Sequence, residues 1–163
     1  MAEEGVQSST DSDFIGTYPI LAKVAQVIFA IFSVGLIVDP FNSFHKTAFG
    51  HRSAKLDDIA FIYITLGSFL IINTIFIIFH AILGERIPRR LAMMFTTVGC
   101  LFHIIAASLI IHNWRKMQGG LISTYNNESY GSKQYLDMLI SGGVFTFITF
   151  AAFVADAYFT IRY

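Results

Sequence analysis

A stretch without any charged residue, 91–111 (LAMMFTTVGCLFHIIAASLII), lies in the second half of the chain. An α-helix rises about 1.5 Å per residue, so a stretch of this length crosses a hydrocarbon core of about 30 Å. Three further apolar stretches lie at about 18–38, 57–83 and 135–159. We therefore predict an all-α membrane protein, an antiparallel bundle of four transmembrane helices with short loops.

Composition supports a membrane protein and argues against several other classes. Of the 163 residues, 55% are hydrophobic and 13% are charged, whereas soluble domains carry roughly 25% charged residues. The net charge is zero and the cations are spread along the chain, so we expect no nucleic-acid surface. The single Cys100 excludes an intramolecular disulfide.

The sequence also lacks the motifs of known catalytic and cofactor sites. It contains no HExxH pair, no glycine-rich phosphate loop and no nucleophile elbow. We therefore expect a protein that is not an enzyme and binds no cofactor or metal, with the lipid bilayer as its surroundings.

The first residues differ from the rest of the chain. Residues 1–16 are rich in serine and acidic side chains and contain no Lys or Arg. This composition is typical of a disordered tail and differs from the basic start of a cleaved signal peptide. We expect residues 17–163 to form the transmembrane domain.

Local signals predict where the first two helices begin and end. The pair Asp39-Pro40 should end the first helix, because the residue before a proline is pushed out of the α region. Asp57 and Asp58 are candidate N-caps of the second helix, and Gly84 is its predicted C-terminal stop.

The orientation in the membrane rests on two local features, because the counts of Lys and Arg on the two sides are nearly equal. Three arginines crowd the tight turn 84–90, which favours that turn inside the cell. Asn127 begins a glycosylation sequon in the loop 113–134, which favours that loop outside. We predict that both termini are cytoplasmic, with Asn127 as a candidate glycosylation site.

Several polar side chains fall inside the predicted spans, where they are costly and therefore candidates for function. Lys23 and Asp156 lie about one to two turns from the cytoplasmic face on the first and last helices, so we predict an ion pair. The pair could be a structural latch or a coupling site of a transporter. Asn73 and His103 lie near the midplane of adjacent spans, so we expect a hydrogen bond that holds helices together or relays protons.

Small residues and interfacial anchors complete the prediction. Small residues let helix backbones approach closely, either within the bundle or between proteins, which would include a homo-oligomer. Trp and basic side chains favour the membrane–water interface. The packing residues are Gly99, Gly142, Gly143, Ala151 and Ala155, and the anchors are Arg89, Arg90, Trp114, Arg115 and Lys116.

Three short motifs carry a resemblance to a known group of proteins. Val98-Gly99-Cys100 lies early in the third span, His112-x-Trp114-Arg115-Lys116 at its exit, and Asp156 shortly before an aromatic and basic ending. With these motifs and its span spacing the chain resembles the small arthropod four-span proteins of septate junctions, the Snakeskin and Pasiflora group. It lacks the larger, cysteine-containing loops of claudins and tetraspanins.

The resemblance implies a structural function rather than a catalytic one. It implies a structural component of septate, or occluding, cell junctions in the plasma membrane at lateral cell contacts. Such a component would support the paracellular barrier by lateral association with other junction membrane proteins. Two alternatives remain open, a trafficking or lipid-organising protein similar to MARVEL-domain tetraspans and a small transporter or channel subunit.

Overall fold

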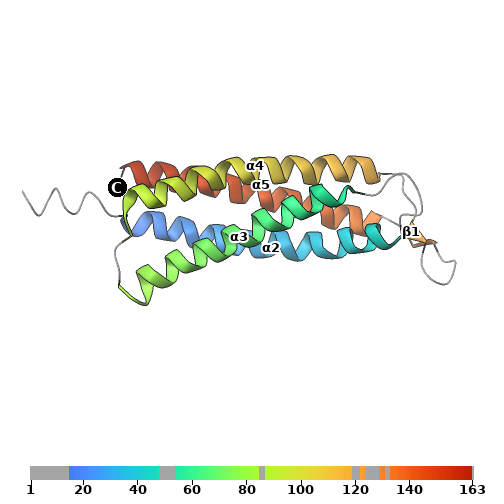
Figure 1. Ribbon diagram of the computed structural model, residues 1–163. Coiled ribbons are helices and arrows are strands. Elements are labelled where there is room, and N and C mark those ends of the chain that lie inside the picture. The colour runs from blue at the N-terminus through green and yellow to red at the C-terminus, as the bar shows by residue number, and fades with distance from the viewer. Residues whose placement is uncertain are drawn as a thin grey trace, which may run out of the picture.

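The computed structural model consists of four long helices and one small hairpin (Figure 1). The helices are α2 (Thr17–Thr47), α3 (Leu56–Ala81), α4 (Arg89–Met117) and α5 (Lys133–Arg162). The strands β1 (Ile122–Ser123) and β2 (Ser129–Tyr130) pair antiparallel between α4 and α5. The structure describes residues 15–47, 54–84, 87–118, 122–123, 129–130 and 133–162.

The four helices pack antiparallel as a closed ring. Helix α2 packs against α5 and α3, and α4 completes the ring by packing against α5 and α3. Figure 1 shows α3 tilted relative to the other three helices. Helices α3 and α4 therefore diverge toward the end of the bundle where the chain passes from one to the other. The predicted fold class is confirmed.

Each helix is long and apolar enough to span a membrane, and the bundle is apolar on its outside. Large side chains are exposed on several helices, for example Ile31 (55%), Ile64 (66%) and Met94 (67%). Such a continuous apolar exterior matches hydrocarbon rather than water. The chain is therefore an integral, multi-pass membrane protein.

The predicted end of the first helix is wrong, because α2 continues through Pro40 to Thr47. A proline inside a helix removes one N–H donor and usually bends or breaks the helix. Here the next residue, Phe41, is 2% exposed and its ring meets Tyr63 of α3 edge-on, with 6.1 Å between centroids. The burial of Phe41 favours continuing the helix past the proline.

The second span, α3, lacks the predicted N-cap but is followed by the predicted glycine. Lys55 occupies the N-cap position without a side-chain hydrogen bond, so the prediction of Asp57 or Asp58 as the N-cap is wrong. Both carboxylates lie in the first turn, where the helix dipole favours negative charge. The predicted stop is confirmed, because Gly84 follows the helix with φ of 65°, a conformation that favours glycine.

The third helix is longer than the predicted span 91–111, since it begins at Arg89 and ends at Met117. Asn113 is buried in its last turns and donates a hydrogen bond to Asp58 of α3, with 3.3 Å between Nδ2 and Oδ2. This contact ties the start of α3 to the end of α4. With 29 residues, α4 is longer than the roughly 20 residues that a membrane span needs.

The predicted tail and sequon lie mostly outside the described residues. Of residues 1–16, only Ile15 and Gly16 are described, and Asn127 is not. Ile15 is buried, and its N–H donates to the carbonyl oxygen of Ile87 at 3.2 Å. The end of the predicted tail is therefore packed against the turn between α3 and α4.

Candidate functional site

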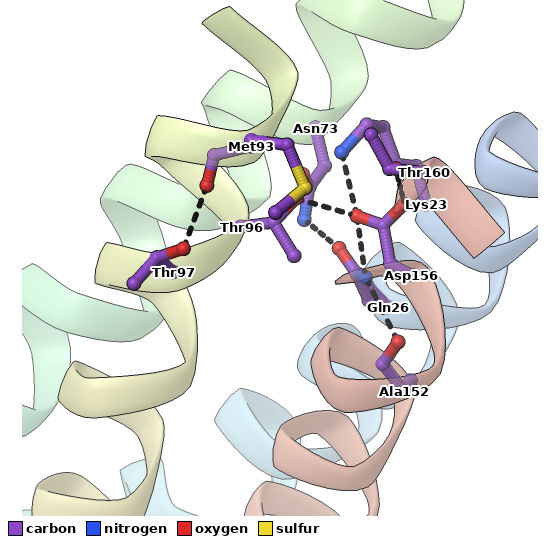
Figure 2. Close-up of polar contacts among 9 residues, drawn as sticks. All are labelled: Lys23, Gln26, Asn73, Met93, Thr96, Thr97, Ala152, Asp156 and Thr160. Carbon is purple, nitrogen blue, oxygen red and sulfur yellow. Dashed lines mark hydrogen bonds and ion pairs between the residues drawn. The ribbon is translucent and has the colours of Figure 1, made fainter. Parts of the chain in front are cut away.

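The most distinctive site is a cluster of polar side chains near the end of the bundle where α2 begins and α5 ends (Figure 2). All four helices contribute to it, and each contributing side chain is at most 3% exposed. Its members are Lys23 and Gln26 of α2, Asn73 of α3, Thr96 of α4, and Asp156 and Thr160 of α5. We call these six residues the polar cluster.

Asp156 is the acceptor at the centre of the polar cluster. The predicted ion pair is present, because Lys23 Nζ lies 2.8 Å from Asp156 Oδ2. The same oxygen accepts hydrogen bonds from Thr96 Oγ1 at 2.8 Å and from Gln26 Nε2 at 3.3 Å. Thr160 Oγ1 donates to Oδ1 at 3.4 Å. The carboxylate therefore holds groups from three helices, and Gln26 extends the network to the fourth.

Gln26 is the link that brings α3 into the network. Its Oε1 accepts a hydrogen bond from Asn73 Nδ2 at 2.8 Å, and its Nε2 also donates to the carbonyl of Ala152 at 3.3 Å. A second contact with α3 comes from Lys23, whose Nζ lies 5.0 Å from the ring centroid of Phe76. A cation over an aromatic face is attracted by the ring quadrupole, so Phe76 also stabilises the lysine.

The polar cluster forms one layer because of where its members lie along their helices. Lys23 lies six residues after Thr17, and Asp156 lies six residues before Arg162. At about 1.5 Å per residue, both lie roughly 9 Å from the same end of the bundle. Asn73 and Thr96 lie at similar depths on α3 and α4. The layer thus closes the bundle near one membrane face.

The chemistry of this layer is that of a closed, neutral network. One cation faces one anion, and the other four members are uncharged donors and acceptors. Removing two charges from water is expensive, and the expense is offset when geometry is good and neighbouring hydrogen bonds are made. Both conditions hold here. The polar cluster is therefore suited to fixing the register of four helices, whereas a site for transported ions requires access to water.

The predicted hydrogen bond between Asn73 and His103 is wrong. Asn73 donates to Gln26, while His103 Nδ1 lies 2.8 Å from the carbonyl oxygen of Gly99 on its own helix. His103 lies seven residues, or about 10 Å, beyond Thr96 along α4, which places it outside the layer of Asn73. Both side chains are buried, but they belong to different levels of the bundle.

His103 instead belongs to an aromatic stack at mid-membrane. Its ring centroid lies 4.7 Å from that of Phe153 and 5.3 Å from that of Phe69. Because a carbonyl can only accept, Nδ1 carries the proton and Nε2 is left as an acceptor. Nε2 is buried without a hydrogen-bond partner. A relay between Asn73 and His103 therefore has no geometric basis.

This difference gives a testable pair of variants. Replacing His103 with Phe removes an unpaired buried nitrogen and keeps an aromatic ring, so we expect unchanged or slightly increased stability. Replacing Asn73 with Leu leaves Gln26 Oε1 without its donor, and we expect a loss of about 1–3 kcal/mol. Thermal unfolding of the detergent-solubilised protein measures both. The reverse order of stability would contradict the assigned hydrogen bonds.

Three of the predicted packing glycines lie at close helix contacts. A Cβ at Gly99 would overlap the ring of Phe153, and one at Gly142 would overlap Ile37 of α2. At Gly143 a Cβ would lie 3.1 Å from Ile110 Cγ2 of α4. The adjacent glycines of α5 therefore admit two different neighbours, α2 on one side and α4 on the other. Ala155 is half-buried, whereas Ala151 is exposed and does not pack within the bundle, which leaves it only the predicted alternative of contact between proteins.

A second polar contact, which the sequence analysis does not single out, joins α2 to α5 beside Gly142. Ser33 Oγ lies 2.6 Å from Thr146 Oγ1 and 3.0 Å from the carbonyl oxygen of Gly142. Thr146 also bonds the same carbonyl at 2.9 Å. Single hydroxyl groups give only a weak signal in a sequence, because most bond to their own helix. Their shared glycine partner becomes evident only in the folded bundle.

The predicted anchors lie at both ends of the bundle. Arg89 donates a hydrogen bond to the carbonyl of Ile161 near the end of α5, and Arg90 is exposed at the same end. Trp114 is half-buried against the apolar core, while Arg115 is exposed and Lys116 is half-buried. Trp114 thus takes part in packing.

No match was found when the chain was compared with protein-family models, with curated proteins and with solved structures. No family is therefore identified. Within the described ranges, no group of three or more His, Cys, Asp or Glu side chains could hold a metal ion. The findings establish a four-helix protein with four membrane spans.

Proposed function

We propose that this protein is a structural, integral-membrane component of septate junctions. It would support assembly of the paracellular barrier by lateral association with other junction membrane proteins at lateral cell contacts. In this orientation both termini are cytoplasmic and the β1–β2 hairpin faces the intercellular gap.

The observation that carries the proposal is the closure of the polar cluster by all four helices. A network with a paired charge, buried at every member, gives a rigid unit rather than a path for ions. A rigid bundle with an apolar exterior can associate with other membrane proteins through its sides. This arrangement favours a scaffold over the transporter alternative, which would use the same residues.

The size of the segments between the helices points the same way. The segments 48–55 and 118–132 join the helices on the proposed outer side, and both are too short to hold a separate domain. Adhesion across a wide intercellular gap would need larger domains. Lateral assembly within one membrane is therefore the mechanism we favour, in agreement with the resemblance to septate-junction proteins.

The proposal can be tested in a polarised arthropod epithelium. We expect the epitope-tagged protein at septate contacts, and we expect its depletion to let a fluorescent dextran cross the cell layer. Re-expression of the natural chain should restore the barrier. Re-expression of a Thr97→Ala chain should restore the barrier equally well. Thr97 is exposed and bonds only to the carbonyl of Met93, so this variant controls for the effect of a substitution as such.

The same experiment separates the trafficking alternative. A vesicular location together with an intact barrier after depletion would contradict the junction proposal. It would favour the MARVEL-like role in membrane trafficking instead.

A further inference from the structure

A groove between α3 and α4 opens toward the surrounding bilayer. It has a volume of about 330 Å³ and an almost wholly apolar lining. Helix α3 contributes Ile64, Thr65 and Ser68 to its wall, and α4 contributes Met94, Val98 and Phe102. The tilt of α3 away from α4 in Figure 1 separates the two helices on this side.

Two hydroxyl groups in this groove have no hydrogen-bond partner in the described part of the chain. Thr65 is 1% exposed, and its Oγ1 is buried and unpaired. Ser68, one turn later, is exposed to the bilayer and also forms no hydrogen bond.

Exposed hydroxyls elsewhere on the helices behave differently from that of Ser68. Thr74, Thr97, Ser108 and Ser141 each donate to the carbonyl four residues earlier. Such a bond satisfies a hydroxyl without any partner outside its own helix. The two hydroxyls of the groove are therefore unusual, and they lie together.

The depth of the exposed Ser68 hydroxyl limits what can satisfy it. Helix α3 runs from Leu56 to Ala81, so Ser68 lies at its middle and Thr65 lies roughly 5 Å from it. The polar groups of lipids lie about 15 Å from the bilayer midplane. A lipid therefore offers only hydrocarbon at this level. The membrane constituent that places hydrogen-bonding groups there is another transmembrane helix.

We propose that α3 and this groove form the interface between two copies of the chain, related by a two-fold axis along the membrane normal. Two copies inserted with the same orientation place identical residues at identical depths. A hydroxyl both donates and accepts, so Ser68 can pair with Ser68 of the partner subunit. The Ser68 hydroxyls of the two copies can thus satisfy each other.

The surface of α3 beside Ser68 fits this close approach. Gly67 has no atom within 4 Å of the position where a Cβ would be. It lies between Ile64 and Ile71, which are 66% and 61% exposed. Small residues flanked by large ones let helix backbones approach and side chains interlock in membranes. The groove then receives apolar side chains of the partner subunit.

This inference deepens the proposed function, on which its biological meaning rests, because a two-fold pair would be the building unit of lateral assembly. It can nevertheless be tested without any junction. The test uses the full chain in cell membranes and measures contact between copies directly.

The experiment places single cysteines at one depth on two different helices. Ser68→Cys on α3 is compared with Ile148→Cys on α5, both in a Cys100→Ala background. Ile148 lies at the middle of α5, is 38% exposed and belongs to the helix diagonal to α3. Membranes are oxidised with copper phenanthroline, and disulfide-linked dimer is measured by non-reducing electrophoresis.

We expect several-fold more linked dimer from Ser68→Cys than from Ile148→Cys. Adding Gly67→Leu to the Ser68→Cys chain should reduce the dimer several-fold, because the side chain fills the interface, whereas its Cβ meets no atom of its own bundle within 4 Å. Monodisperse elution in detergent checks that each variant folds. Equal linkage at both positions, or none at Ser68→Cys, would overturn the inference.

A second measurement needs no cysteine. Photobleaching of single fluorescently tagged molecules should show two steps for the natural chain and one for Gly67→Leu. One step for the natural chain would also overturn the inference. If the protein still marks septate contacts in that case, only the inference fails and the proposed function stands.

Discussion

Replacing Asp156 with Asn should cause the largest loss of stability of any single polar substitution in the described bundle. Lys23 is 0% exposed, so the change leaves its ammonium group buried without a counter-charge. Breaking a buried ion pair in this way costs about 3–5 kcal/mol. The measurement is the thermal unfolding midpoint of the solubilised protein, together with its amount at the cell surface.

A double variant separates charge from shape. In Lys23→Met with Asp156→Asn, neither charge remains, and Asn keeps one oxygen that can accept from Thr96 and Gln26. Replacing a buried ion pair by residues of similar volume is often neutral, so we expect most of the lost stability to return. If Asp156→Asn alone left stability and surface delivery unchanged, the polar cluster would not be a structural latch, and the transporter alternative would gain support.

Replacing Gly142 with Ala should be strongly destabilising, although it adds only one methyl group. The added Cβ would overlap Ile37 and would lie 3.3 Å from the carbonyl oxygen of Ser33, so backbone as well as side chain must move. Overpacking a well-filled core typically costs about 1–3 kcal/mol. Thermal unfolding again gives the measurement.

The same substitution at Gly35 is the matched control. Gly35 is also on a membrane helix, but a Cβ there would have no atom within 4 Å. Alanine favours the helix over glycine by up to about 1 kcal/mol, so Gly35→Ala should be neutral or stabilising. Adding Ile37→Ala to Gly142→Ala removes the overlapping side chain, so the double variant should lose less stability than the sum of the two single substitutions. Equal effects of the two glycine substitutions would contradict the close contact of α2 with α5.

The ion pair could be predicted because charges are rare in the spans. Lys23 and Asp156 lie at equal distances from one end of the first and last helices, which adjoin in a closed ring of four. A charge inside hydrocarbon needs a partner, so depth and adjacency together were enough.

The uncharged members of the polar cluster were harder to assign. Asn73 could face either neighbour of α3, and only the rotation of that helix directs it to Gln26 on α2. The sequence does offer one signal: Gln26 follows Lys23 by three residues, so both lie on the same face of one helix.

The extent of the first helix could not be predicted from local rules. Proline opposes a helix through its own backbone, and this effect is visible in any sequence. The burial of Phe41, one residue later, depends on the position of Tyr63 on another helix. Tertiary packing therefore outweighs the local preference at Pro40, and the helix continues.

The ion pair also has a consequence for biosynthesis. Its two residues are 133 positions apart in the chain, and ribosomes add about 5–20 residues per second. Lys23 is therefore made roughly 7–27 s before Asp156. During that interval the first span carries a charge that no residue yet made neutralises in this way. Chains that stop before the last span therefore keep the charge of Lys23 inside the membrane without this partner, which is energetically costly.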